Sequence, residues 1–252
     1  FKHGFKKPKE ELNAELNFSD MRYLRSSSFQ TNIFDSSNNQ TLSYSQSNPV
    51  HGGNWNATFQ VDYTRPFAKN ARLDLGEKTY YIRFHSQNFP TKQLPGQPEQ
   101  EESALKNHFT YTQQVHGVYG NFADQWGATG MQLGLRGEYF SYNGFVYQYN
   151  APVKNDYLSF FPTLFLTHKL SAKEDLNFNY ARRVNRPGFM QLIPYIDVSN
   201  PQDTSQGNPN LKPEFINAFE AGYTYTYGKN NTFLVSAYYQ LTNDLIQRYR
   251  RF

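Results

Sequence analysis

The sequence predicts an all-β protein: the wall of an antiparallel transmembrane β-barrel, in which about nine long strands are joined alternately by short turns and long loops. Apolar and polar residues alternate along the predicted strands, as at 54–64, so each strand has one apolar and one polar face. No apolar run approaches the roughly 18 residues that a membrane helix needs. Only every second residue of a barrel strand faces lipid, so a mean hydropathy of −0.78 is compatible with a membrane protein.

Composition and charge restrict the function classes. The chain has 252 residues, of which 17% are aromatic, and a formal net charge of +4. Its basic residues are dispersed, so nucleic-acid binding is not predicted. Cysteine is absent, which fits an oxidising compartment without proving one. No signal peptide follows Phe1, so we expect a fragment or a processed product.

In the first third of the chain, strands are predicted from Leu12 and over 54–64. The Ser-, Asn- and Gln-rich segment 25–53 between them is predicted to be a long loop. Thr41–Ser45 alternates like a strand, but we assign it to this loop. The reason is that two turns on the same side of a membrane must be separated by an even number of spanning strands.

The next predicted strand begins at Leu73 and changes its pattern near Gly76. Apolar residues occupy odd positions before Gly76 and even positions from Tyr80 onward. A β-bulge at Gly76 would produce this change. The Pro-, Gln- and Glu-rich segment 86–104 is predicted to be a second long loop.

The second half repeats the alternation, with strands near 106–121, from Met131 and over 157–170. A further strand ends at Pro187, and five prolines between Pro187 and Glu214 exclude a continuous ladder there. Alternation resumes after this loop and continues to a last strand that starts at Phe233.

The connections alternate between two lengths. The short ones lie near 6–10, 66–70, 122–128, 171–175 and 228–231, and the long ones near 26–52, 86–104, 143–155 and 187–214. Outer-membrane barrels keep short turns on the periplasmic side and long loops outside. The sequence therefore predicts periplasmic turns and extracellular loops in that arrangement.

Four motifs, YARRVNRP, LIP, GNPNLKPE and FEAGY, together resemble the signature of the outer-membrane β-barrel family of TonB-dependent receptors, of the type common in Bacteroidetes. The segment VDYTRPF at 61–67 resembles the first of these motifs more weakly. The resemblance implies the barrel portion of a bacterial outer-membrane receptor that takes up a scarce ligand such as a siderophore, a glycan, a peptide or a cobalamin-like molecule. It also implies outer-membrane lipid, the TonB complex and a surface lipoprotein as partners.

In such receptors, a plug domain and a TonB box precede the barrel, and nothing in residues 1–252 matches them. The signature residues are expected to form a fixed turn that re-enters the wall, in preference to contacting a ligand. These residues are Pro187, Gly207, Asn208, Pro209, Leu211, Lys212, Pro213 and Glu214.

Arg182, Arg183 and Arg186 form the densest basic cluster of the sequence. They could attract an anionic ligand at the outer mouth of one strand, or they could pair with loop carboxylates or anionic surface lipid. Arg182 continues the apolar parity of its strand, so we place it near the outer interface, where an outward-facing Arg costs little.

No enzyme activity, metal site or cofactor is predicted. The six histidines are isolated and lack H-x-x-x-H or HExxH spacing. The GLRG motif at 134–137 lies inside a strand without a following helix, so it is not a phosphate-binding loop.

Parity also predicts which residues face outward and which face the interior. The residues predicted to face outward are Trp55, Phe59, Val61, Leu133, Leu135, Phe178, Phe219, Val235 and Ala237. Those predicted to face inward are Gln60, Asp62, Gln132, Arg136, Glu138, Asn177, Asn179 and Ser236.

Nine strands would supply about two-fifths of a plugged barrel of roughly 22 strands. We therefore expect an open curved sheet whose first strand, 12–25, does not pair with its last, 233–247. The alternative architecture is a soluble β-sandwich ligand-binding module, whose strands would average about 5–6 residues.

Overall fold

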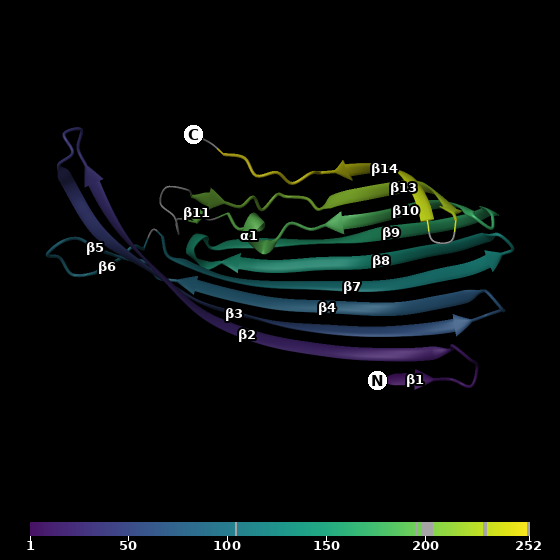
Figure 1. Cartoon of the computed structure of the whole chain (residues 1–252). Helices are drawn as coiled ribbons and strands as arrows, with labels where there is room; N and C mark the ends of the chain where they lie inside the picture. The colour runs from purple at the N-terminus through teal and green to yellow at the C-terminus, as the bar shows by residue number, and fades with distance from the viewer. Residues whose placement is uncertain (104, 195, 198–203, 229–230, 251–252) are drawn as a thin grey trace.

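The computed structural model describes residues 1–103, 105–194, 196–197, 204–228 and 231–250. Ten antiparallel strands lie side by side in chain order and form one curved wall (Figure 1). They are β1 (Lys2–Gly4), β2 (Glu11–Phe34), β3 (Gln40–Pro66), β4 (Arg72–Asn88), β7 (Asn107–Trp126), β8 (Thr129–Val146), β9 (Ala151–Ser171), β10 (Glu174–Asn185), β13 (Glu214–Tyr227) and β14 (Asn231–Asn243).

The remaining elements are short and lie at one end of the wall (Figure 1). β5 (Thr91–Gln93) pairs with β3 and with β6 (Gln100–Glu101), and β11 (Ile196–Asp197) pairs with β12 (Ser205–Gln206). A 3-10 turn, η1 (Tyr147–Tyr149), joins β8 to β9, and a helix of one turn, α1 (Phe189–Leu192), follows β10. We call this the long-loop end and the opposite end the short-turn end.

The predicted alternation of short and long connections holds in part. At the long-loop end the connections 89–106 (β4 to β7) and 186–213 (β10 to β13) are long, whereas 35–39 (β2 to β3) and 147–150 (β8 to β9) are short. At the short-turn end, β3 passes to β4 between Pro66 and Arg72, and β7 to β8 between Trp126 and Thr129. The second of these turns is shorter than predicted because β7 continues to Trp126. None of the described helices is long and apolar enough to cross a membrane.

The loop predicted at 25–53 is wrong. β2 and β3 pair there residue by residue as far as Ile33 and Leu42, and the connection is the tight turn 35–39. Thr41–Ser45 is therefore part of β3. The two strands satisfy each other's backbone groups, so the polar composition that is typical of a loop is also compatible with a long ribbon. The loops predicted at 86–104 and 143–155 are likewise shortened, since β4, β8 and β9 extend into them.

The bulge predicted at Gly76 is also wrong, because β4 keeps one register with β3 and β7 throughout. Apolar residues change parity because the inward face of β4 is itself apolar near the long-loop end, where Phe84 packs against the buried core. Gly76 has a different role. A Cβ atom there would lie 2.3 Å from the ring of Tyr119, so only glycine allows that ring to cross the strand.

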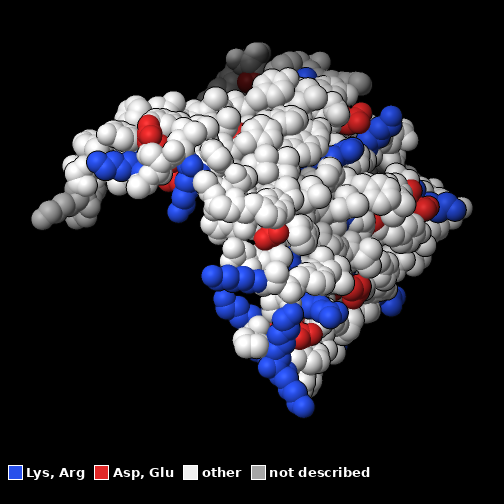
Figure 2. Space-filling view, turned by 90° about the vertical axis from the view of Figure 1, so that its right-hand side faces the viewer, with Lys and Arg blue, Asp and Glu red and all other residues white. Residues whose placement is uncertain are grey.

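The predicted facing of side chains is confirmed. The ladders place every residue predicted to face outward on one side of the wall and every residue predicted to face inward on the other. Leu135 on the outward face is 53% exposed, whereas Glu138 on the inward face is 8% exposed. Figure 2 shows the wall as an arc viewed from the short-turn end, with Lys and Arg side chains projecting from its hollow side.

The sheet is open, as predicted. β1 forms one edge and β14 the other, and no ladder joins β14 to β1 or β2 in the described chain. The long strands have 12 to 27 residues, more than twice the usual strand length. Such strands exclude the sandwich alternative.

Candidate functional site

The connection from β10 to β13, residues 186–213, is named here the inward loop, and its described residues fold back over the concave face. The ring of Phe189 lies 4.2 Å from the ring of Tyr111 and 4.9 Å from that of Phe109, measured between centroids. Leu192 and Ile193 are 0% and 1% exposed. The inward loop thus covers the most deeply buried apolar cluster of the wall, at its long-loop end.

Backbone hydrogen bonds hold the two limbs of the inward loop together. The N–H of Gly207 donates to the carbonyl of Ile193 (3.0 Å), and that of Asn208 donates to the carbonyl of Gln191 (2.6 Å). A Cβ atom on Gly207 would lie 2.5 Å and 2.6 Å from these same carbonyl oxygens. Only glycine can occupy this position without moving one limb.

The other signature residues lie at the root and turn of the inward loop. Pro187 is buried, and Leu211 packs against the apolar cluster. Asn208 accepts the backbone N–H of Asn210 (2.9 Å) in a local turn. Glu214 is 5% exposed and accepts hydrogen bonds from Asn185 Nδ2 (2.6 Å) and from the backbone N–H of Ile246. Pro209 and Lys212 are exposed, whereas Pro213 is half-buried.

The structure does not bring the three clustered arginines together. Arg182 and Arg183 are consecutive in β10, so their side chains leave opposite faces of the sheet. The Arg182 guanidinium lies 4.8 Å from the ring centroid of Phe215. Arg183 is on the concave side and exposed. Arg186 follows the strand and also turns to the concave side, where it meets a carboxylate.

That carboxylate is Glu138 of β8, which joins the inward loop to the wall. Arg186 Nη2 lies 2.5 Å from Glu138 Oε2, and Arg136 Nε lies 2.6 Å from Glu138 Oε1. Arg186 Nε also donates to the hydroxyl of Tyr157 (3.1 Å), and its guanidinium lies 4.7 Å from the ring centroid of Phe140. These charge-assisted bonds in a mostly buried setting fix the root of the inward loop against β8 and β9.

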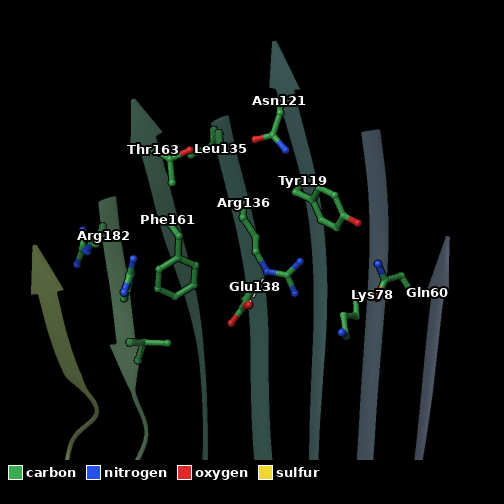
Figure 3. Close-up of a pocket in the computed structure, with 12 residues that line it drawn as sticks. Gln60, Lys78, Tyr119, Asn121, Leu135, Arg136, Glu138, Phe161, Thr163 and Arg182 are labelled. Carbon is green, nitrogen blue, oxygen red and sulfur yellow. Dashed lines mark hydrogen bonds and ion pairs between the residues drawn. The ribbon is translucent and has the colours of Figure 1, made fainter. Parts of the chain in front are cut away.

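A basic hollow of about 440 Å³ opens on the concave face beside this junction (Figure 3). Lys78, Arg136 and Arg183 are its cations on the concave face, and Tyr119 and Phe161 supply aromatic rings. Arg182 also lines the hollow. Arg136 is already paired, but Lys78 and Arg183 form no ion pair with any residue that the structure describes. The hollow therefore presents two uncompensated cations between aromatic surfaces, an arrangement suited to an anionic ligand with planar groups.

The ring of Tyr119 is held in place from three sides. Its hydroxyl donates to Asp62 Oδ1, the guanidinium of Arg136 lies 5.3 Å from its centroid, and Gly76 makes room beneath it. The alternation of the strands predicts that Asp62 and Arg136 face inward, but it does not show that Lys78, Tyr119 and Phe161 are their neighbours. The registers of four consecutive strand pairs, from β3 to β9, are needed to place these residues side by side.

No metal-binding group of three or more His, Cys, Asp or Glu side chains occurs in the part of the chain that the structure describes. Two of the histidines pair with threonines across neighbouring strands. His116 Nδ1 lies 2.8 Å from Thr79 Oγ1, and His168 Nδ1 lies 2.8 Å from Thr129 Oγ1.

Comparisons with known proteins address the family. A model described as the outer membrane protein beta-barrel family matches residues 3–252. A search of curated proteins finds no match. Among solved structures, the ferric citrate transporter FecA in its unliganded form is similar with a TM-score of 0.51 and 15% identity, over 87% of this chain and 33% of that chain.

Two further solved structures are similar to this chain. The alcaligin outer membrane receptor FauA from Bordetella pertussis has a TM-score of 0.49 and 15% identity, over 94% of this chain and 38% of that chain. The siderophore receptor PirA from Pseudomonas aeruginosa has a TM-score of 0.35 and 12% identity, over 93% of this chain and 56% of that chain. This chain thus spans well under two thirds of the length of each of these proteins.

Proposed function

This chain belongs to the outer membrane protein β-barrel family, and from this premise we propose that it forms part of the wall of a TonB-dependent receptor that takes up a scarce ligand into the cell. Its place is the bacterial outer membrane. The observation that carries the proposal is the two-faced wall, with an apolar outward face and a basic, aromatic hollow on the concave face.

The outward face meets the requirement of a membrane wall. Large apolar side chains such as Leu133, Leu158 and Phe160 are between 51% and 62% exposed there. A soluble protein rarely leaves an apolar surface of this extent open, whereas lipid covers it in a barrel. Outer-membrane lipid is accordingly the partner of this face in the proposed receptor.

The concave face supports uptake in preference to catalysis. Its cations, aromatic rings and inward loop can bind and orient a ligand, and we propose no enzyme activity for it. FecA, to which this chain is similar, is a ferric citrate transporter, and an iron chelate of this anionic type would suit Lys78 and Arg183. A siderophore, a glycan, a peptide or a cobalamin-like molecule are the ligand classes to test.

Energy for uptake would come from the TonB complex through a plug domain and TonB box elsewhere in the same receptor. A surface lipoprotein is a further proposed partner, at the long-loop end. The signature residues from Pro187 to Glu214 have a structural role in this proposal, since most of their contacts are within the inward loop and with the wall.

The test is uptake by cells that carry or lack the full receptor, measured with radiolabelled ligands of the four classes. We expect uptake of one class to require the receptor and to stop when the proton-motive force is collapsed. The double substitution Lys78→Ala and Arg183→Ala should lower that uptake, whereas Lys154→Ala, an exposed cation on the outward face, should not. Receptor-independent uptake of all four classes, or uptake that persists without a proton-motive force, would overturn the proposal.

A further inference from the structure

We infer that the long-loop end of the wall contains a calcium-binding site made by Glu102 and the side-chain amides of Gln46, Asn48, Asn88 and Asn107, named here the amide cluster. This inference is independent of the proposed uptake function. It rests on oxygen atoms that the fold buries without a hydrogen-bond donor.

Four side-chain carbonyl oxygens of the amide cluster are inaccessible to solvent and accept no hydrogen bond from the residues that the structure describes: Gln46 Oε1, Asn48 Oδ1, Asn88 Oδ1 and Asn107 Oδ1. Asn107 as a whole is 4% exposed. A buried acceptor without a hydrogen-bond partner destabilises the folded protein. Four such oxygens in one region indicate that a further group satisfies them.

The strand registers bring these residues to one place. Asn88 of β4 and Asn107 of β7 are direct cross-strand partners on the concave face. Val50 of β3 pairs with Asn88, so Asn48, two residues further along β3, is a diagonal neighbour of Asn88 on the same face. The amide cluster therefore spans three adjacent strands at their long-loop ends.

Glu102 adds a carboxylate to the amide cluster. Gln46 Nε2 donates to Glu102 Oε2 (2.7 Å), and the backbone N–H of Glu102 donates to the carbonyl of Pro90 (2.8 Å), two residues beyond Asn88. Pro90 is itself buried. Glu99 and Glu101 lie in the same short segment, where Glu101 is paired with Lys106 (3.0 Å).

The donor set selects the class of ligand. Carbonyl and carboxylate oxygens that accept no hydrogen bond can bind a hard cation. Ca²⁺ takes 6–8 oxygen ligands in flexible geometry at about 2.3–2.6 Å. Mg²⁺ requires a stricter octahedron and retains its waters, so it suits a cluster of neutral amides less well. A single carboxylate predicts a weak site, with a dissociation constant of about 10⁻⁴–10⁻³ M, the range of extracellular calcium modules.

A bound cation would tie β5 and β6 to the wall, because Glu102 follows β6 directly whereas the amides belong to β3, β4 and β7. Buried water is the alternative occupant, since water can also donate to orphaned carbonyl oxygens. The two occupants differ in their response to calcium and to charge, and the experiment uses both differences.

The experiment is equilibrium dialysis of the full receptor against ⁴⁵Ca²⁺ in detergent after treatment with a chelator. Glu102→Gln keeps the size of the side chain. We expect this variant either to bind one calcium ion fewer or to bind that ion at least tenfold more weakly. Asn107→Asp adds a second carboxylate and should raise the affinity for the same calcium ion about tenfold. Asn179→Asp, a matched change on the concave face of β10, should leave calcium binding unchanged, and excess Mg²⁺ should not displace the ion.

Folding of each variant is checked by resistance to unfolding in sodium dodecyl sulfate at room temperature. If Glu102→Gln fails this check, Asn107→Asp decides alone, because it keeps every oxygen of the amide cluster. If the unmodified receptor and both variants bind the same number of calcium ions with the same midpoints of the binding curve, water alone occupies the amide cluster. This result would overturn the inference.

Discussion

The β2–β3 ribbon (24–50) and the inward loop are the two longest excursions at the long-loop end, and they are built in opposite ways. The two strands of the ribbon pair with each other, and its apolar side chains remain exposed, Ile33 by 44% and Leu42 by 40%. Where the structure describes it, the inward loop has no regular structure beyond the short elements α1, β11 and β12, yet it buries Leu192 and Ile193 almost completely.

The difference follows from where the backbone groups find partners. In the ribbon, each strand supplies donors and acceptors to the other. The base of the ribbon also pairs with β5 at 45–47, but its tip has no partner strand other than its own and needs no support from the wall. Prolines remove donors from the inward loop and prevent such pairing. Its order depends instead on packing against the wall, on the Arg186–Glu138 pair and on the close contact at Gly207. Damage to the wall should therefore affect the inward loop and leave the tip of the ribbon unchanged.

Leu192→Ala should have the largest effect. Truncation of this fully buried side chain removes its apolar contacts and leaves a cavity, at a cost of about 2–5 kcal/mol in the stability of the folded-back loop. Hydrogen exchange of the amides near 188–194 in the purified receptor measures this loss. Leu42→Ala in the ribbon, at an exposed position, should change local stability by less than about 0.5 kcal/mol. Equal effects at the two sites would contradict the comparison.

Glu138→Gln should have the next largest effect, because it leaves Arg136 and Arg186 without their common carboxylate. Charge-assisted hydrogen bonds of this kind contribute about 1.5–3 kcal/mol. The same exchange measurement should show a destabilised loop root, whereas Glu15→Gln, an exposed carboxylate on the concave face of β2, should not. In a double-mutant cycle with Arg186→Met, additive effects would show that the pair does not hold the loop.

Gly207→Ala should cost about 1–3 kcal/mol, the usual range for overpacking. The clash is with two backbone carbonyl oxygens, so a change of side-chain rotamer cannot relieve it. Limited proteolysis within 188–213 should become faster than in the unmodified receptor. Gly4→Ala in β1 is the control, since a Cβ there has no neighbour within 4 Å. Unchanged cleavage of the Gly207 variant would show that the two limbs can separate at no cost.

The sequence was sufficient for the features that depend on local pattern. Alternation places Phe59 and Leu135 outward and Asp62 and Glu138 inward, because one face of each strand meets lipid. The same rule failed for 25–53, since a ribbon beyond the membrane has no apolar environment to impose alternation. It also failed at Gly76, because Tyr80 and Phe84 face inward toward a local apolar core that covers only part of the concave face.

The candidate site was less predictable because it depends on contacts between distant segments. Arg186 and Glu138 are 48 residues apart, and Lys78 approaches Arg136 only through the registers of three strands. The three clustered arginines show the converse error. Proximity in sequence suggested one basic site, but successive residues of a strand point to opposite faces, so Arg182 and Arg183 are separated by the sheet.

The smallest expected effect concerns pH at the tip of the ribbon. The backbone N–H groups of Asn39 and Ser37 donate to Asp35 Oδ1 at 2.8 Å and 2.9 Å and hold the pKa of that carboxyl below its usual value. A carboxyl whose pKa is depressed by folding stabilises the fold above its unfolded pKa, near 3.9, and loses this contribution as the pH falls through its lower folded value.

The backbone amide of Asn39 should therefore lose part of its protection against hydrogen exchange below about pH 4. Amides of the inward loop, which is held by apolar packing near Leu192, should keep theirs at the same pH. Asp35→Asn removes the titration and should make the tip insensitive to pH over this interval. If the tip of the unmodified receptor were equally insensitive, the hydrogen bonds to Asp35 would not contribute to the turn, and strand pairing alone would hold the ribbon closed.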